Sequence, residues 1–182
     1  MPGVDRSILI EAPVATVFEY VADWRNTIKY QHQFSKFEPV GEPVRGLGLT
    51  VDARGWFKGL PVRARLRIVE FVENERIVSR SVAHMRSSAE WLFSPDGDRT
   101  RVRFIANYDW PVPLGNRLLK RIVENEIASM TETSLRDLKR LVEGQVKADA
   151  ARCPTYGGSV APDPQTGSPE RSRNPGPARC EA

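Results

Sequence analysis

Apolar residues alternate with polar ones at the start of the chain and then recur at helical spacing. In residues 6–11, Ile8 and Ile10 share one face, which predicts a strand. Pro13 follows, and proline is well tolerated in a first helical turn because its missing N–H would have no partner there. The apolar residues that come next and continue the helical spacing are Val14, Val17, Phe18 and Val21. We therefore expect a short helix up to residue 23 and a second helical piece over residues 25–31.

Several strands separated by turn residues follow these helices. In the segment PVRARLRIVEF the residues that point one way are Val62, Ala64, Leu66 and Ile68, opposite three arginines. The same alternation predicts an inward face formed by Thr100, Val102, Phe104, Ala106 and Tyr108, joined by Trp91 and Phe93. Turns are expected at Gly41, Gly46, Gly55, Gly59, Asn74 and Asp96–Gly97. This spacing is typical of an antiparallel meander.

A single long helix is predicted over residues 114–143, after Pro111 and Pro113. Its apolar stripe consists of Leu119, Ile122, Val123, Ile127, Met130, Leu138 and Leu141. Gly144 is expected to end this helix, because glycine commonly follows a helix C-terminus. Residues 144–182 are rich in proline and glycine and poor in large apolar side chains, so we expect a disordered tail after a folded domain of residues 4–143.

The order of these elements predicts an α+β fold. We expect a curved antiparallel sheet of six to seven strands wrapped around the long C-terminal helix, with two short helices after the first strand. A sheet of that size does not stay flat, and Gly46, Gly48, Gly55 and Gly59 are expected to permit its bends. A helix lying across a strongly curved sheet leaves an apolar pocket unless large side chains fill the space.

Three segments carry a resemblance to a known family: IEAPVATVFEYVADWRN, EWLFSPDGDRTRVRF and SLRDLKRLVE. Over roughly residues 5–143 the chain resembles the START-like (SRPBCC) group called polyketide cyclase/dehydrase and lipid transport. The resemblance implies a helix-grip fold with a ligand cavity. Members of this group include aromatic polyketide cyclases, coenzyme Q-binding proteins and lipid-transfer proteins, so the resemblance leaves the reaction open.

Composition narrows the chemistry that this fold can host. The net charge of +4 describes a mildly basic protein and indicates no DNA-binding function. Both cysteines, Cys153 and Cys180, fall in the tail, and the domain has no zinc-ligand spacing, so we expect no metal site. Gly46–Gly48 is too short for a dinucleotide fingerprint, and no cofactor is expected. The chain shows no export signal or membrane span, which predicts a cytoplasmic protein.

Few residues are candidates for catalysis. Only His32 and His84 are histidines, and His84 is the better placed of the two, near a turn between strands. Glu126 shares the apolar helix face with Ile122 and Met130, where a buried carboxylate must be paired, neutral or functional; a glutamate at the stripe edge that reaches water is the alternative. Tyr108 points inward near its strand end, where its hydroxyl is expected to meet a ligand carbonyl.

A cavity lining follows from the predicted inward faces. The ligand-binding residues that we expect are Trp56, Trp91, Phe93, Phe104, Tyr108, Ile122, Glu126 and Met130, although core packing explains the aromatic ones equally well. On the outside of the sheet, alternation gathers Arg63, Arg65, Arg67, Arg80, Arg101 and Arg103. This basic face is either a solvated surface balanced by acidic neighbours or a contact for RNA or anionic lipid headgroups.

Three functions remain, in this order. The first is a carrier or binding protein for an apolar small molecule of lipid, isoprenoid, quinone or polyketide type. The second is a polyketide cyclase or dehydratase that acts as an enzyme by shaping a poly-ketone substrate. The third is an interaction protein that uses the basic outer face. A carrier needs an apolar pocket with few ionisable groups, whereas a cyclase needs several polar side chains facing a deep cavity.

Overall fold

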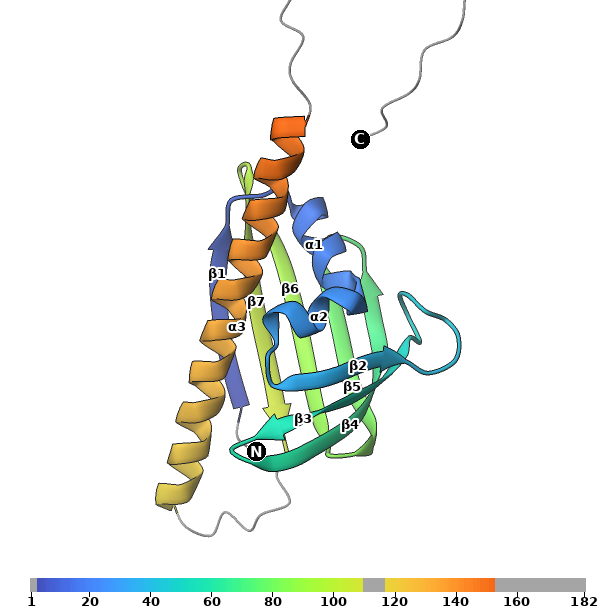
Figure 1. The fold of residues 1–182 in the computed structure, drawn as a ribbon, viewed down its shortest axis with the longest axis vertical. Helices are drawn as coiled ribbons and strands as arrows, with labels where there is room; N and C mark the ends of the chain where they lie inside the picture. The colour runs from blue at the N-terminus through green and yellow to red at the C-terminus, as the bar shows by residue number, and fades with distance from the viewer. Residues whose placement is uncertain (1–2, 110–116, 153–182) are drawn as a thin grey trace, which may run out of the picture.

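The computed structural model describes residues 3–109 and 117–152, which form seven strands and three helices (Figure 1). In chain order they are β1 (Gly3–Ile10), α1 (Val14–Ala22), α2 (Trp24–Tyr30), β2 (Phe34–Pro39), β3 (Thr50–Phe57), β4 (Leu60–Val72), β5 (Arg76–His84), β6 (Ser87–Asp96), β7 (Arg99–Tyr108) and α3 (Arg117–Arg152). The two short helices lie within a residue or two of their expected bounds. None of the helices in the described segments is long and apolar enough to cross a membrane.

All seven strands belong to one antiparallel sheet with the order β1-β7-β6-β5-β4-β3-β2. The chain runs as a meander from β2 to β7, and β1 closes the other edge by pairing with β7. The sheet curls strongly, so that β2 and β3 pass in front of β5 and β6 in Figure 1, while α1 and α2 lie on its concave side and α3 runs along the β1–β7 edge. The expected α+β helix-grip architecture is confirmed.

The curvature has a different origin from the one expected from the glycines. Gly46 and Gly48 lie in the β2–β3 loop and Gly59 in the β3–β4 turn, so these three do not bend a strand. The register instead shifts twice between β4 and β5 and once between β2 and β3, and such bulges bend and twist a strand. Gly55 is not a turn residue either, because it lies inside β3.

At Gly55 another part of the backbone comes too close for a side chain. A Cβ atom there would lie 1.9 Å from the carbonyl oxygen of Gln33, and Trp56 donates its backbone N–H to that same oxygen at 3.0 Å. Only glycine allows this approach, which fastens the segment after α2 to β3. The segment formed by α2 and β2 is therefore held against β3 at this point.

The core lies between the concave face of the sheet and the three helices. Val17 and Phe18 of α1 are fully buried, and the Phe18 ring packs edge-on against Phe71 and Phe93 at 5.2 Å. From α3 the buried apolar side chains are Ile127, Leu135, Leu138 and Val142. The inward faces expected for β4 and β7 and for Trp91 and Phe93 are confirmed, since the matching side chains are buried or partly buried.

Helix α3 departs from expectation in two respects. It continues through Gly144 to Arg152, so the prediction that Gly144 ends the helix is wrong. A glycine inside a helix costs about 1 kcal/mol, but Val146, two residues further on, packs on the core and the following residues favour helix. Ile122 is 54% exposed, so its place in the buried stripe is also wrong. The side chain of Leu119, residues 114–116 and residues 153–182 lie outside the described residues.

Candidate ligand cavity

A cavity lies between the concave face of the sheet and a roof made by α2 and β2. Its floor comes from the inward side chains of the central strands: Val62, Ala64, Leu66, Ile68, Ile77 and Ala89. Its roof comes from Trp24, Thr27 and Gln31 of α2 and its C-cap, with Phe34 and Phe37 of β2. No residue of α3 lines this cavity in the described part of the helix. The short helix α2, rather than the long one, therefore covers the space.

The cavity is small and uncharged. Its volume is about 110 Å³. Within residues 3–109 and 117–152, none of its lining residues is Asp, Glu, Lys, Arg or His. Its polar side-chain groups are the hydroxyls of Thr27, Tyr30, Ser79, Ser87, Ser88 and Tyr108, the amide of Gln31 and the indole N–H groups of Trp24 and Trp91. Such a lining favours a neutral, largely apolar occupant, because a charged one would lose its hydration without an ionic partner.

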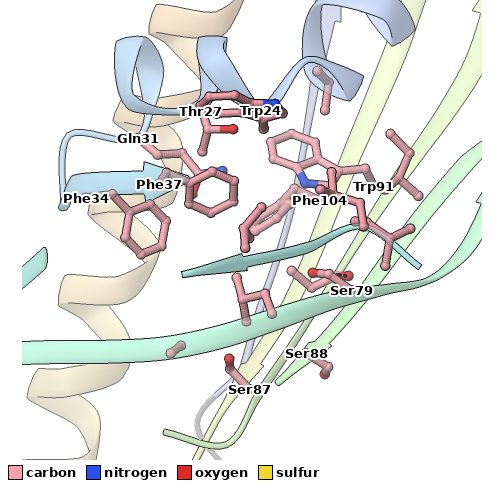
Figure 2. A pocket seen from close by; sticks show the side chains of 18 of the residues that line it. Trp24, Thr27, Gln31, Phe34, Phe37, Ser79, Ser87, Ser88, Trp91 and Phe104 are labelled. Carbon is pink, nitrogen blue, oxygen red and sulfur yellow. Dashed lines mark hydrogen bonds between the residues drawn. The ribbon is translucent and has the colours of Figure 1, made fainter. Parts of the chain in front are cut away.

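Aromatic rings form one wall of the cavity (Figure 2). The rings of Trp91 and Phe104 lie 4.3 Å apart, and Tyr30 meets Trp91 edge-on at 6.1 Å. Figure 2 shows Phe34 and Phe37 on the opposite side, with their rings 5.5 Å apart. Flat apolar rings on two sides of a narrow space fit a ring-bearing or compact ligand better than an extended chain.

A second space of about 60 Å³ adjoins the cavity and leads toward the surface. It lies between the β3–β4 hairpin and α3, where Trp56 and Phe57 face Ile127, Met130 and Thr131. Both spaces share the side chains of Phe34, Val62, Met85 and Tyr108. We call this second space the mouth, and α3 contributes to the site here.

Tyr108 stands where the cavity and its mouth meet. Its side chain borders both spaces, and the described residues offer its hydroxyl no hydrogen-bond partner. Burial raises the pKa of Tyr108 to about 12, so the phenol stays protonated at neutral pH. It is therefore suited to donate a hydrogen bond to a ligand oxygen, and unsuited to remove a proton.

Two further polar groups are buried at the roof. Tyr30 is 1% exposed, and burial raises the pKa of its hydroxyl well above the ordinary range, against a smaller opposing effect of a hydrogen bond with Thr27. The indole Nε1 of Trp24 is buried and has no hydrogen-bond partner among the described residues. An unsatisfied buried donor of this kind destabilises a fold by about 1–3 kcal/mol.

The sequence matches one family model along most of its length. The model is described as polyketide cyclase / dehydrase and lipid transport, and it matches residues 1–143. The chain belongs to this family. No curated protein matches the chain at a significant level.

Solved structures share the same START-like fold. TTHA0849 from Thermus thermophilus is 23% identical with a TM-score of 0.70, covering 79% of this chain and 99% of that one. A START superfamily protein from Mycobacterium smegmatis is 14% identical with a TM-score of 0.60, covering 80% and 97%. The di-domain ARO/CYC BexL from the BE-7585A biosynthetic pathway is 20% identical with a TM-score of 0.57, covering 79% and 47%. At these identities the likeness establishes the fold alone.

Within this family fold, the residues expected to bind a ligand lie in three different places. Trp91, Phe104 and Tyr108 border the cavity. Trp56 and Met130 border the mouth, and Trp56 is 59% exposed. Phe93 is buried against Phe18 in the core and borders neither space, while Ile122 is exposed on α3 away from both.

The carboxylate and histidine candidates lie outside the cavity. Glu126 forms an ion pair with Lys58 of the β3–β4 turn at 3.0 Å, which matches the alternative of a glutamate that reaches water. His84 is exposed on the outer face of the sheet, and His32 contacts Asp137 of α3 at 2.9 Å. The described residues contain no group of three or more His, Cys, Asp or Glu side chains able to hold a metal ion.

Sequence reasoning missed most of the roof. Trp24, Thr27 and Gln31 follow one another at helical spacing and share a face, and Phe34 and Phe37 come directly after them. The signal that could have identified these residues is the high density of aromatic side chains in and directly after a short helix, which cannot bury them by itself. The sequence predicts a second helical piece over residues 25–31, but no ligand-binding role for it.

Proposed function

We propose that this protein binds an uncharged, apolar small molecule in the cavity beneath α2 and β2, as a carrier or binding protein. The observation that carries the proposal is the lining: aromatic and aliphatic side chains surround the space, and no charged side chain of the described residues borders it or its mouth. Tyr108 supplies a protonated hydroxyl at the inner end of the mouth, so we expect the ligand to carry an oxygen there.

The size of the cavity limits the ligand class. Pockets for drug-sized ligands have volumes of about 300–1,000 Å³, several times the roughly 110 Å³ found here. A compact aromatic or isoprenoid-like molecule would need only a modest outward shift of the α2–β2 roof. A long acyl chain would have to displace the roof or extend through the mouth.

A polyketide cyclase is the second candidate, favoured by the family description and by the likeness to BexL. Enolisation of a poly-ketone needs a base close to neutral pKa within reach of the reacting carbon. The lining described above has no carboxylate or histidine, and Tyr108 has a pKa of about 12. Any cyclisation here would therefore depend on holding the substrate in shape, and we place simple binding ahead of it.

Native mass spectrometry of the purified protein tests the proposal. We expect a mass shift from a retained small molecule, recovered unchanged by solvent extraction, and a raised melting temperature with neutral quinones, isoprenoids or aromatic ketones. Stabilisation only by charged ligands, or none across the panel with no retained molecule, would contradict it. Conversion of an added poly-ketone into a cyclic product would favour the cyclase instead.

A further inference from the structure

The outer face of strands β3, β4 and β5 carries arginines that lie directly opposite one another. Arg54 lies directly opposite Arg63 in the β3–β4 register, and Arg67 lies directly opposite Arg80 in the β4–β5 register. All four are exposed, and none has an ion-pair partner among the described residues. Like charges directly opposite each other destabilise a sheet, so this arrangement opposes folding unless an anionic partner neutralises it.

The neighbouring acidic groups do not cancel this charge. Asp52 is already held by Arg65, through two hydrogen bonds of 2.7 and 3.2 Å that lower the pKa of Asp52. Glu38 on β2 is paired with Lys36 at 2.7 Å. The outer arginines of β7 differ from the four above, since Arg101 and Arg103 pair with acidic residues.

The tip of the same hairpin is apolar and exposed. Trp56 is 59% exposed and Leu60 is 55% exposed. Between them, Lys58 forms its ion pair with Glu126 of α3, and Trp56 and Phe57 of the same hairpin border the mouth. Trp56 lies two residues beyond Arg54 along β3, a distance of about 7 Å.

We propose that the β3–β4 hairpin docks onto the surface of an anionic lipid bilayer. Trp56 and Leu60 enter the boundary between headgroups and acyl chains, to the depth of about 5–10 Å that interfacial segments reach, and Arg54 and Arg63 then lie at the level of the phosphates. Tryptophan is favoured at that boundary, and arginine is attracted to acidic headgroups. This docking would turn the mouth toward the lipid, and it does not depend on which ligand the cavity holds.

A single-stranded nucleic acid is the other polyanion that such a face suggests. Proteins that bind single strands stack successive bases on several aromatic side chains. On the outer face of β3–β5 the described residues offer only Trp56, and it lies at the tip rather than along the row of arginines. An apolar hairpin tip with arginines next to it fits a lipid bilayer better than it fits a single-stranded nucleic acid.

Sedimentation with vesicles tests the docking surface. Vesicles of phosphatidylcholine containing one third phosphatidylglycerol should bind the full-length protein, and pure phosphatidylcholine vesicles should bind it at least about tenfold more weakly. Raising the salt should weaken binding to the acidic vesicles. The double variant R54Q/R63Q should lose about tenfold or more in affinity, whereas R101Q/R103Q, with the same change in net charge on the same face, should not.

Two leucines provide a second matched pair. Leu60→Ala at the tip should weaken vesicle binding severalfold. Leu47→Ala, which removes a leucine that is slightly more exposed from the β2–β3 loop, should leave it unchanged. Equal losses for both arginine pairs would overturn the proposal by showing only a general charge effect. No binding to acidic vesicles, or tighter binding to single-stranded RNA with the same dependence on Arg54 and Arg63, would overturn it too.

Discussion

Filling the cavity should abolish binding without unfolding the protein. Ala64 points into the cavity from β4 and is 5% exposed. An empty cavity destabilises a fold by about 24 cal/mol per Å³ of its volume. For the cavity of about 110 Å³ found here, the free energy that filling could recover is therefore at most about 2.6 kcal/mol. The three carbon atoms added by Ala64→Leu bring about 2 kcal/mol of burial, offset by any strain of fitting them.

We therefore expect the unfolding free energy of Ala64→Leu to stay equal to wild type or rise by up to about 2 kcal/mol. Its affinity for the neutral fluorophore N-phenyl-1-naphthylamine, titrated by fluorescence, should fall at least about tenfold. Ala89→Leu fills the same space from β6 and provides a second variant.

Leu138→Ala is the matched control. Leu138 is fully buried in α3 and borders neither the cavity nor the mouth, so the change should cost about 2–5 kcal/mol of stability with the fluorophore affinity kept within about twofold. Wild-type affinity in both cavity-filling variants would refute the reasoning, because a probe that ignores a filled cavity does not bind there.

Three further changes test single residues of this account. Tyr108→Phe should weaken binding of a quinone about three- to tenfold, because one hydrogen bond to the ligand is lost. Since the pKa of Tyr108 is about 12, the affinity of the wild-type protein should not change between about pH 6 and 9 in a calorimetric titration. Glu126→Gln should leave ligand affinity unchanged across pH, since its carboxylate pairs with Lys58 outside the lining; a pH-dependent loss would return it to the site. Gly55→Ala should destabilise the fold by more than about 2 kcal/mol in urea unfolding, because its Cβ would lie 1.9 Å from the Gln33 carbonyl oxygen. A smaller loss would show that the backbone at Gln33 moves away to make room.

The strands could be predicted well because one face of the sheet is exposed to solvent and the other is buried. Along β7 the side chains from Thr100 to Ala106 alternate between more buried and less buried without a break, so the period of two alone identifies the inward face. Gly144 shows the limit of such local rules. Its helix continues because Val146 packs on the core, which is a tertiary contact that no local pattern contains.

The site was harder to predict than the fold, for a geometric reason. The expected lining put Ile122 and Glu126 of α3 beside the ligand, on the assumption that the long helix covers the curved sheet. The structure covers the cavity with α2 and β2, held over β3 by the close approach at Gly55. How far a sheet curls depends on bulges between β4 and β5, and their positions cannot be read from alternation.

The most direct test of the central claim is to locate a bound neutral ligand by NMR. With methyl-labelled protein, N-phenyl-1-naphthylamine should give nuclear Overhauser contacts to the floor residues Val62, Leu66, Ile68 and Ile77. Contacts confined to Ile122 or to Val69, which are exposed outside the cavity, would contradict it and place the ligand on the surface.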